Sequence, residues 1–153
     1  MIKIREAGIS DLPVLAELFN LYRVFYKEEP DLAGALRFLS DRIKNKQSFL
    51  FLSSFQNADC GFIQLYPLFS STRMKPLLLL NDLFVKEDYR GKKLSVALIN
   101  KAKSFCQEYG ACGLILETAS DNAVANSLYT STQFILDSKH NYYSWDNPYT
   151  YEG

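Results

Sequence analysis

The chain has 153 residues, of which 48% are hydrophobic and 22% charged, a composition typical of a globular protein that can bury a core. Its 17 basic and 17 acidic side chains balance, which gives no electrostatic case for nucleic acid or an anionic membrane as the main partner. No apolar run approaches the length of about 18 residues expected for a membrane helix, and the N-terminus lacks a signal-peptide core. We therefore expect a cytoplasmic protein with a single domain over residues 1–153.

The first half of the chain predicts one strand, two helices and a strand pair. Residues 2–5 alternate apolar and charged side chains, as a half-buried strand does. Two segments with apolar side chains every three or four residues follow, and Asp31 can cap the second helix. Residues 48–54 and 60–68 then predict two antiparallel strands joined by a polar turn.

A continuous apolar strand over residues 77–85 organises the second half. A strand with apolar side chains on both faces is expected inside a sheet, and the helix over 94–109 that follows a short loop completes a βα unit. Further strands are expected at 113–117, 134–137 and 142–145. The fold class that results is α/β, a mixed central sheet flanked by helices, antiparallel first and with at least one parallel crossover.

The loop from Arg90 to Ser95 is a candidate anion site, because it lies between the apolar strand and the next helix. Gly91 permits a tight backbone, and the helix start offers unpaired N–H groups and the positive end of its dipole. Arg90, Lys92 and Lys93 add positive charge, which suits a phosphate or pyrophosphate. The alternative is a basic loop that only caps a helix.

Other chemistries find little support in the sequence. The single histidine, His140, has no cluster of cysteines or acids near it, so we expect no metal site. The three cysteines have no CxxC spacing and read as buried small side chains in a reducing compartment. Neither a GxSxG elbow nor a P-loop pattern is present, which disfavours a hydrolase or an NTPase.

Two motifs in the second half resemble those of the GNAT N-acetyltransferases. Residues 90–95 read Arg-Gly-Lys-Lys-Leu-Ser after the apolar strand, where the family has Arg/Gln-x-x-Gly-x-Gly/Ala. Residues 122–129 match the second signature, Asn-x-x-Ala-x-x-Leu-Tyr, in full. The approach Leu-Asn-Asp-Leu-Phe-Val over residues 80–85 looks most like the diamine, or polyamine, N-acetyltransferase branch.

The resemblance implies a GNAT-like fold over the whole chain, acetyl-CoA as co-substrate without a metal, and direct transfer of acetyl to an amine. By the same resemblance Tyr129 would act as general acid beside the sulfur. The main chain of the central strand would pair with pantetheine, the loop would cradle the pyrophosphate, and an asparagine would bond the pantetheine side. These implied cofactor-binding residues are Leu83, Phe84, Val85, Arg90, Gly91, Lys92, Lys93, Leu94, Ser95 and Asn122.

Four positions depart from the family pattern, and one of them, Ser95, is a small residue where the family has Gly or Ala. Asn81 stands where the diamine branch has a glutamate thought to help deprotonate the amine, and an amide cannot act as a base. Glu117, at the end of the neighbouring strand, could take that proton directly or through water; it could equally be a solvated strand end. Lys93 and Gln133 replace common glycines, and Lys93 would cost about 1 kcal/mol if its backbone needs a positive φ.

The acceptor site is expected between the first two helices and the last strands. Tyr26, Glu28 and Asn81 are the candidate substrate-binding residues, since aromatic and acidic side chains suit a cationic amine. We expect a polyamine-like or other small amino metabolite. The alternatives are a protein or peptide amine, or an acyl-CoA-binding module without catalysis. The resemblance also implies a homodimer, with the strand 142–145 as a candidate interface because its edge would otherwise be exposed.

Overall fold

The computed structural model describes residues 1–149, which fall into two compact units, Met1–Ala119 and a second that begins at Ser120. The two units are described separately. The first contains, in chain order, β1 (Ile2–Glu6), η1 (Ile9–Asp11), α1 (Leu12–Phe25), α2 (Leu32–Lys44), β2 (Phe49–Phe55), β3 (Ala58–Ser70), β4 (Lys75–Val85), η2 (Glu87–Tyr89), α3 (Leu94–Tyr109) and β5 (Leu114–Ile115). The second contains α4 (Ala123–Ser131).

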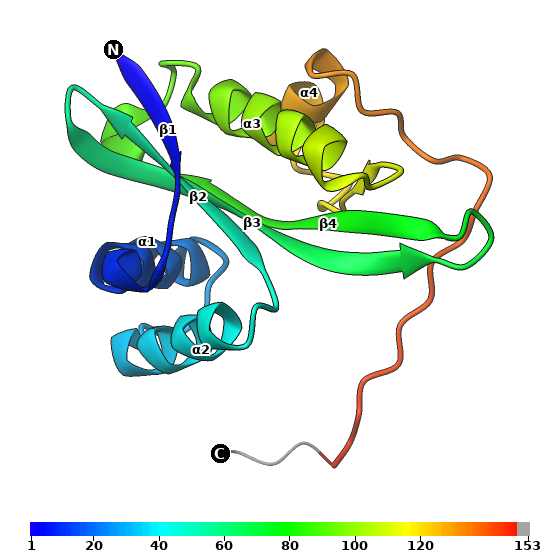
Figure 1. Ribbon diagram of the computed structural model, residues 1–153, viewed down its shortest axis with the longest axis horizontal. Coiled ribbons are helices and arrows are strands. Elements are labelled where there is room, and N and C mark those ends of the chain that lie inside the picture. The colour runs from blue at the N-terminus through cyan, green and yellow to red at the C-terminus, as the bar shows by residue number, and fades with distance from the viewer. Residues whose placement is uncertain (150–153) are drawn as a thin grey trace. The chain divides into compact units, whose positions relative to one another are not determined.

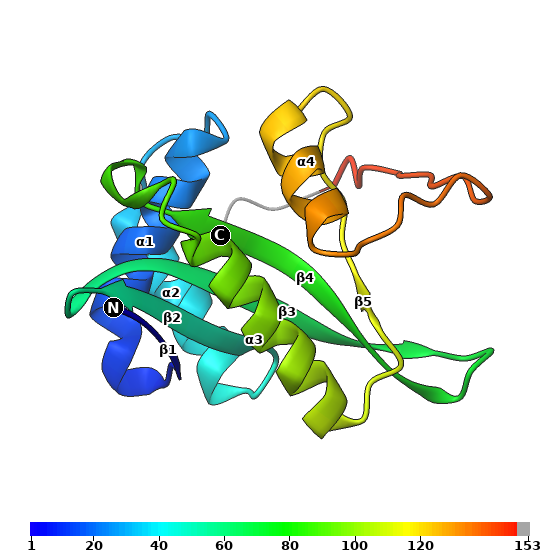
Figure 2. The ribbon, with the colours of Figure 1, turned by 90° about the horizontal axis from the view of Figure 1, so that it is seen from above.

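The strands of the first unit form one mixed sheet in the order β1-β2-β3-β4-β5. The pairs from β1 to β4 are antiparallel, and β4 pairs with β5 in parallel across the α3 crossover. Helices α1 and α2 cover one face of this sheet, and α3 covers the other (Figure 1; Figure 2). The predicted fold class, a mixed α/β sheet flanked by helices, is confirmed.

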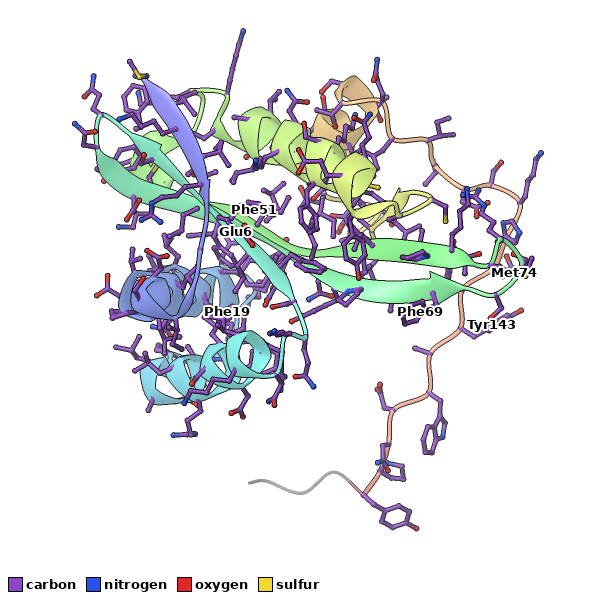
Figure 3. The ribbon with its side chains drawn as sticks, viewed as in Figure 1. Glu6, Phe19, Phe51, Phe69, Met74 and Tyr143 are labelled. Atoms are coloured by element: carbon purple, nitrogen blue, oxygen red, sulfur yellow. The ribbon has the colours of Figure 1, made fainter. Side chains whose placement is uncertain are left out.

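The sheet separates two apolar layers. On the face of α1 and α2, Phe19 packs against Phe62 of β3 with ring centroids 6.3 Å apart. On the face of α3, Phe51 of β2 meets Phe105 at 5.4 Å. Figure 3 labels Phe19 and Phe51, and it also shows Phe69 near the far end of the long β3–β4 hairpin. Both faces of β3 and β4 are therefore used, which explains the near-continuous apolar sequence of these central strands.

Local signals place the helices where the sequence predicts them. The Asp31 side chain accepts a hydrogen bond from the amide of Gly34 at 2.9 Å, which caps α2 as expected. Helix α3 spans the predicted residues and ends at Gly110, whose φ of +81° is the left-handed conformation that glycine adopts at low cost.

Three strand predictions need correction. The strand expected at 113–117 is reduced to Leu114–Ile115, because its ladder with β4 stops at the pair Leu79 and Ile115. Residues 134–137 and 142–145 form no strand in the described part of the chain. Most of their β-forming side chains are exposed, Phe134 being half-buried, and no described strand pairs with them. A strand without a hydrogen-bonded partner is not stable in water.

Candidate active site

Strand β4 is irregular where the motif residues begin. Gln64 of β3 pairs with Asp82, but the next residue of β3 pairs with Leu80, so Asn81 is the extra residue of a β-bulge. The ladder between β4 and β5 ends at Leu79, so residues 80–85 have no described strand on that edge. This edge carries main-chain groups that an extended ligand can pair with, and it includes the predicted residues Leu83, Phe84 and Val85.

A buried polar cluster follows the bulge. Asp82 lies on the same face of β4 as Phe84, toward α1 and α2, and is only 3% exposed. Its carboxylate accepts hydrogen bonds from the amide groups of Gln64 and Asn81. The Tyr22 hydroxyl of α1 donates to the Asn81 carbonyl at 3.3 Å. The cluster therefore joins the bulge to α1 and β3.

Burial determines the electrostatics of this cluster. Loss of water raises the pKa of Asp82 above its ordinary value, and hydrogen bonds from Gln64, Tyr22 and Asn81 lower it only in part. Burial, together with the negative charge of Asp82, raises the pKa of Tyr66 to about 12, while Arg42 acts in the opposite direction. Asp82 is therefore a carboxyl that holds a proton more readily than an exposed aspartate.

Sequence reasoning missed Asp82, Gln64 and Tyr66. The available signal was an acidic residue inside an otherwise apolar strand, since charged side chains are almost never buried without a partner. Attention went instead to Asn81, which is exposed and whose amide is held by the carboxylate behind it.

The predicted anion loop has the backbone that such a site needs. Gly91 has φ +78° and Lys93 has φ +64°, both in the left-handed region. Helix α3 begins at Leu94, and Lys93, its N-cap residue, makes no side-chain hydrogen bond to the helix start. The first amides of α3, which include that of Ser95, are therefore not capped by the preceding side chain and can receive an anion.

The cations of the loop differ in their surroundings. The Arg90 Nε donates to the Val85 carbonyl at 3.0 Å, and its guanidinium lies over the rings of Phe25 and Phe84, with centroids 5.1 and 5.7 Å away. Arg90 thus ties the loop to the end of β4 and to α1. Lys92 lies 5.4 Å from the ring centre of Phe55.

The other predicted residues of the first unit are exposed. Tyr26 contacts Tyr22 edge-on, with centroids 5.0 Å apart. It therefore extends the aromatic surface that Tyr22 forms beside the bulge. Glu28 faces Arg23, its Oε2 3.9 Å from a guanidinium nitrogen. Glu117 follows the short β5 and is exposed to solvent. The structure brings Tyr26 and Asn81 together through Tyr22, whereas Glu28 and Glu117 stay outside that cluster of contacts.

The second unit holds the asparagine–tyrosine motif. The Asn122 Oδ1 accepts a hydrogen bond from the amide of Ala125 at 3.1 Å, which makes Asn122 the N-cap of α4. Tyr129 is half-buried in the same helix and meets Phe134 edge-on at 5.6 Å. Gln133 has φ +73°, the conformation for which the family's common glycine is suited. The motif therefore forms a capped helix with an aromatic contact at its end.

Within residues 1–149, no group of three or more His, Cys, Asp or Glu side chains could hold a metal ion. In the same residues, no helix is both long and apolar enough to cross a membrane. The unpaired edge of β4 and the uncapped start of α3 suit a ligand with an amide-bearing arm and a phosphate group. Together they define an α/β protein with a candidate site for an extended ligand that carries a phosphate group.

Comparison with known proteins gives the family. A family model described as "Acetyltransferase (GNAT) family" matches residues 15–134. The chain belongs to this family, whose members use acetyl-CoA as co-substrate, and is an acyl-CoA-dependent N-acetyltransferase.

Two curated relatives and one solved structure extend the match over nearly the whole chain. The uncharacterized N-acetyltransferase YhfO of Bacillus subtilis is 39% identical over 145 residues, which cover 95% of this chain and 97% of the relative. A probable acetyltransferase of Haemophilus influenzae is 30% identical over 138 residues, with coverage of 90% and 92%. The crystal structure of a probable acetyltransferase is 33% identical, with a TM-score of 0.90 and coverage of 95% and 97%.

Proposed function

We propose that the acceptor is a primary amine of a small molecule, polyamine-like or another amino metabolite. The observation that carries this proposal is the bulge of β4, where Asn81, Tyr22 and the buried Asp82 meet. Tyr26 extends this surface with a second aromatic ring, and Glu28 adds a carboxylate beyond it. Aromatic faces and carboxylates both attract an ammonium group, so the side of the bulge that faces α1 suits a cationic acceptor.

In the proposed reaction, the amine attacks the thioester directly, without a covalent enzyme intermediate. The oxyanion would accept a hydrogen bond from a main-chain amide of the open β4 edge, and we assign this to Leu83. The loop with Gly91 and the uncapped start of α3 would hold the pyrophosphate. Most of the rate would come from bringing the two substrates into contact in the correct orientation.

Tyr129 is the proposed general acid for the departing thiolate, and Asn122 the proposed contact to pantetheine. The basis for both is the complete match of residues 122–129 to the family signature. The substitution Tyr129→Phe removes the hydroxyl and keeps the ring that contacts Phe134. It should lower kcat, and unchanged turnover at every pH would rule the acid role out.

One other acceptor class remains as an alternative. A protein or peptide amine would also suit an exposed aromatic and acidic surface. The acyl-CoA-binding module without catalysis, which the replacements at Asn81 and Lys93 had suggested, is disfavoured because the chain belongs to a family of N-acetyltransferases. Neither relative described above is named for a polyamine, so the acceptor class has to be found by experiment.

The test is release of free thiol from acetyl-CoA by the purified protein. The acceptor panel contains spermidine, short diamines, lysine analogues, an aminoglycoside and a basic peptide, and calorimetry measures acetyl-CoA binding in parallel. Release with a small amine supports the proposal, and release with the peptide alone supports the first alternative. Tight binding without release for any acceptor would refute every acceptor class in the panel.

A homodimer is a further part of the proposal. The strand first suggested as its interface does not form in the structure, but Tyr142, Tyr143 and Trp145 remain 79%, 91% and 79% exposed. Exposed aromatic side chains of this size favour an interface. Light scattering after gel filtration measures the mass directly, and a monomer at micromolar concentration would refute the dimer.

A further inference from the structure

Asp82 is a carboxyl group at a buried position, where acidic side chains are rarely found. It lies at 3% exposure in β4, between the polar Asn81 and the apolar Leu83. A buried carboxyl costs stability unless it is paired, and here the partners are amides and a hydroxyl rather than a cation. Such an arrangement suits a group that must exchange a proton.

The hydrogen bonds of the cluster leave one acceptor unsatisfied. Gln64 is fully buried, and its Nε2 is directed at Asp82, while its Oε1 has no hydrogen-bond partner among the described residues. Buried amide oxygens without a donor are rare in proteins. A donor-rich group that reaches the Asp82 carboxylate, such as an ammonium with three N–H bonds, could satisfy this oxygen as well.

We propose that Asp82 is the general base of the acetyl transfer, taking a proton from an unhindered primary ammonium that enters from the side of Tyr22. The inference rests on the proposed function, and it assigns to Asp82 the role that Asn81 cannot perform. Asp82 is so little exposed that only a nitrogen with a single substituent, that is, a primary amine, can approach it.

One N–H bond of the ammonium breaks and its proton moves to the carboxylate oxygen of Asp82, which leaves a neutral amine with a free electron pair. That pair forms the C–N bond to the thioester carbonyl, and the C–S bond then breaks. A second proton leaves the nitrogen as the amide forms and balances the proton that the thiolate receives through Tyr129. Asp82 returns its own proton to water after the product leaves.

The burial of Asp82 favours its role as a base. Burial raises its pKa, which makes it a better base than an exposed carboxylate while it is still ionised. The titratable groups that face it are Tyr22 from α1 and Tyr66 from β3, and Arg42 of α2 acts on Tyr66 from behind. Asn81 and Gln64 keep the carboxylate in place and oppose the effect of burial.

The test is the pH dependence of kcat at saturating acetyl-CoA and amine, which reports groups in the complex. In the wild type, kcat should fall as the pH falls through the raised pKa of Asp82, because the protonated carboxyl cannot accept a proton. Asp82→Asn should lower kcat at least 100-fold, as loss of a general base does, and should abolish this acidic limb. Asp41→Asn, on the exposed side of α2, is the matched control and should keep the wild-type kcat and its acidic limb.

A second variant keeps the proposal falsifiable if Asp82→Asn fails to fold, as judged by circular dichroism and acetyl-CoA binding. Asn81→Ala removes an exposed donor that lowers the pKa of Asp82, so its acidic limb should move to higher pH. The assignment would be overturned if the acidic limb of the kcat–pH profile stayed in place in Asn81→Ala. It would also be overturned if folded Asp82→Asn retained that limb. Loss of the limb in Glu117→Gln but not in Asp82→Asn would give the role to Glu117.

Failure of the proposed function and failure of the base assignment give different results. If the wild type releases thiol with no amine of the panel, the proposed function fails, and the inference about Asp82 fails with it. If the wild type is active and Asp82→Asn keeps its rate and its limb, only the base assignment is wrong. Equal rates with a primary amine and with its N-methylated derivative would contradict the requirement for an unhindered nitrogen.

Discussion

Replacing Lys93 with glycine should stabilise the folded chain. Lys93 has φ +64° and ψ +22°, a left-handed conformation that costs a residue with a Cβ about 1–2 kcal/mol. Glycine removes this cost, but its extra freedom in the unfolded chain offsets about 0.4–1 kcal/mol of the gain. The net increase in the free energy of unfolding is therefore centred on about 0.8 kcal/mol, within a range of about 0–1.6 kcal/mol. The central value corresponds to about 2–3 °C in Tm for a chain of this size.

The assay is thermal and urea unfolding followed by circular dichroism, without acetyl-CoA. Lys92→Gly is the matched control, because it removes the same charge from the same loop at a residue without a positive φ, and it should not stabilise. Lys93→Ala removes the charge but keeps the Cβ, so it should stay close to the wild type. If Lys93→Gly unfolds no later than Lys92→Gly, the explanation by backbone strain is wrong.

Two further predictions concern stability. Asp31→Ala should lower the free energy of unfolding by about 1 kcal/mol, because it removes the N-cap bond to Gly34, whereas Asp41→Ala within the same helix should change it little. Equal effects in urea unfolding would contradict the capping role. Phe62→Ala should cost about 3–5 kcal/mol, since Phe62 is fully buried under α1, and Phe69→Ala, at 80% exposure, should stay within about 0.5 kcal/mol. Similar losses for the two phenylalanines would refute this account of the core.

The sequence was sufficient for those parts of the fold that depend on local pattern. The apolar run of β4, the span of α3 and the cap at Asp31 follow from periodicity and from residue types that act within one turn. The left-handed backbone at Lys93 was also foreseen as a possibility, from the position of a glycine in the family motif. Each of these features needs only neighbours in the chain.

Features that depend on pairing between distant segments were not predictable in the same way. The bulge at Asn81 exists because of the register between β3 and β4, and only this register places Asp82 opposite Gln64. The strands expected at 134–137 and 142–145 have suitable side chains but no described partner, and β propensity alone does not supply one. The sequence interpretation therefore included the loop before α3 but lacked Asp82 and Gln64, which meet at the bulge.

The polar cluster behind the bulge should lower the free energy of unfolding relative to an apolar replacement, and we expect it to be retained for its chemistry. This can be measured. Asp82→Leu alone leaves the buried Gln64 amide without its acceptor, which should cost about 1–3 kcal/mol. The double variant Gln64→Leu/Asp82→Leu removes both partners and the unsatisfied Oε1, so it should unfold at a urea concentration near or above that of the wild type. The same double variant should bind acetyl-CoA and release no thiol. If the double variant is clearly less stable than the wild type, the cluster contributes to folding, and its retention needs no functional reason.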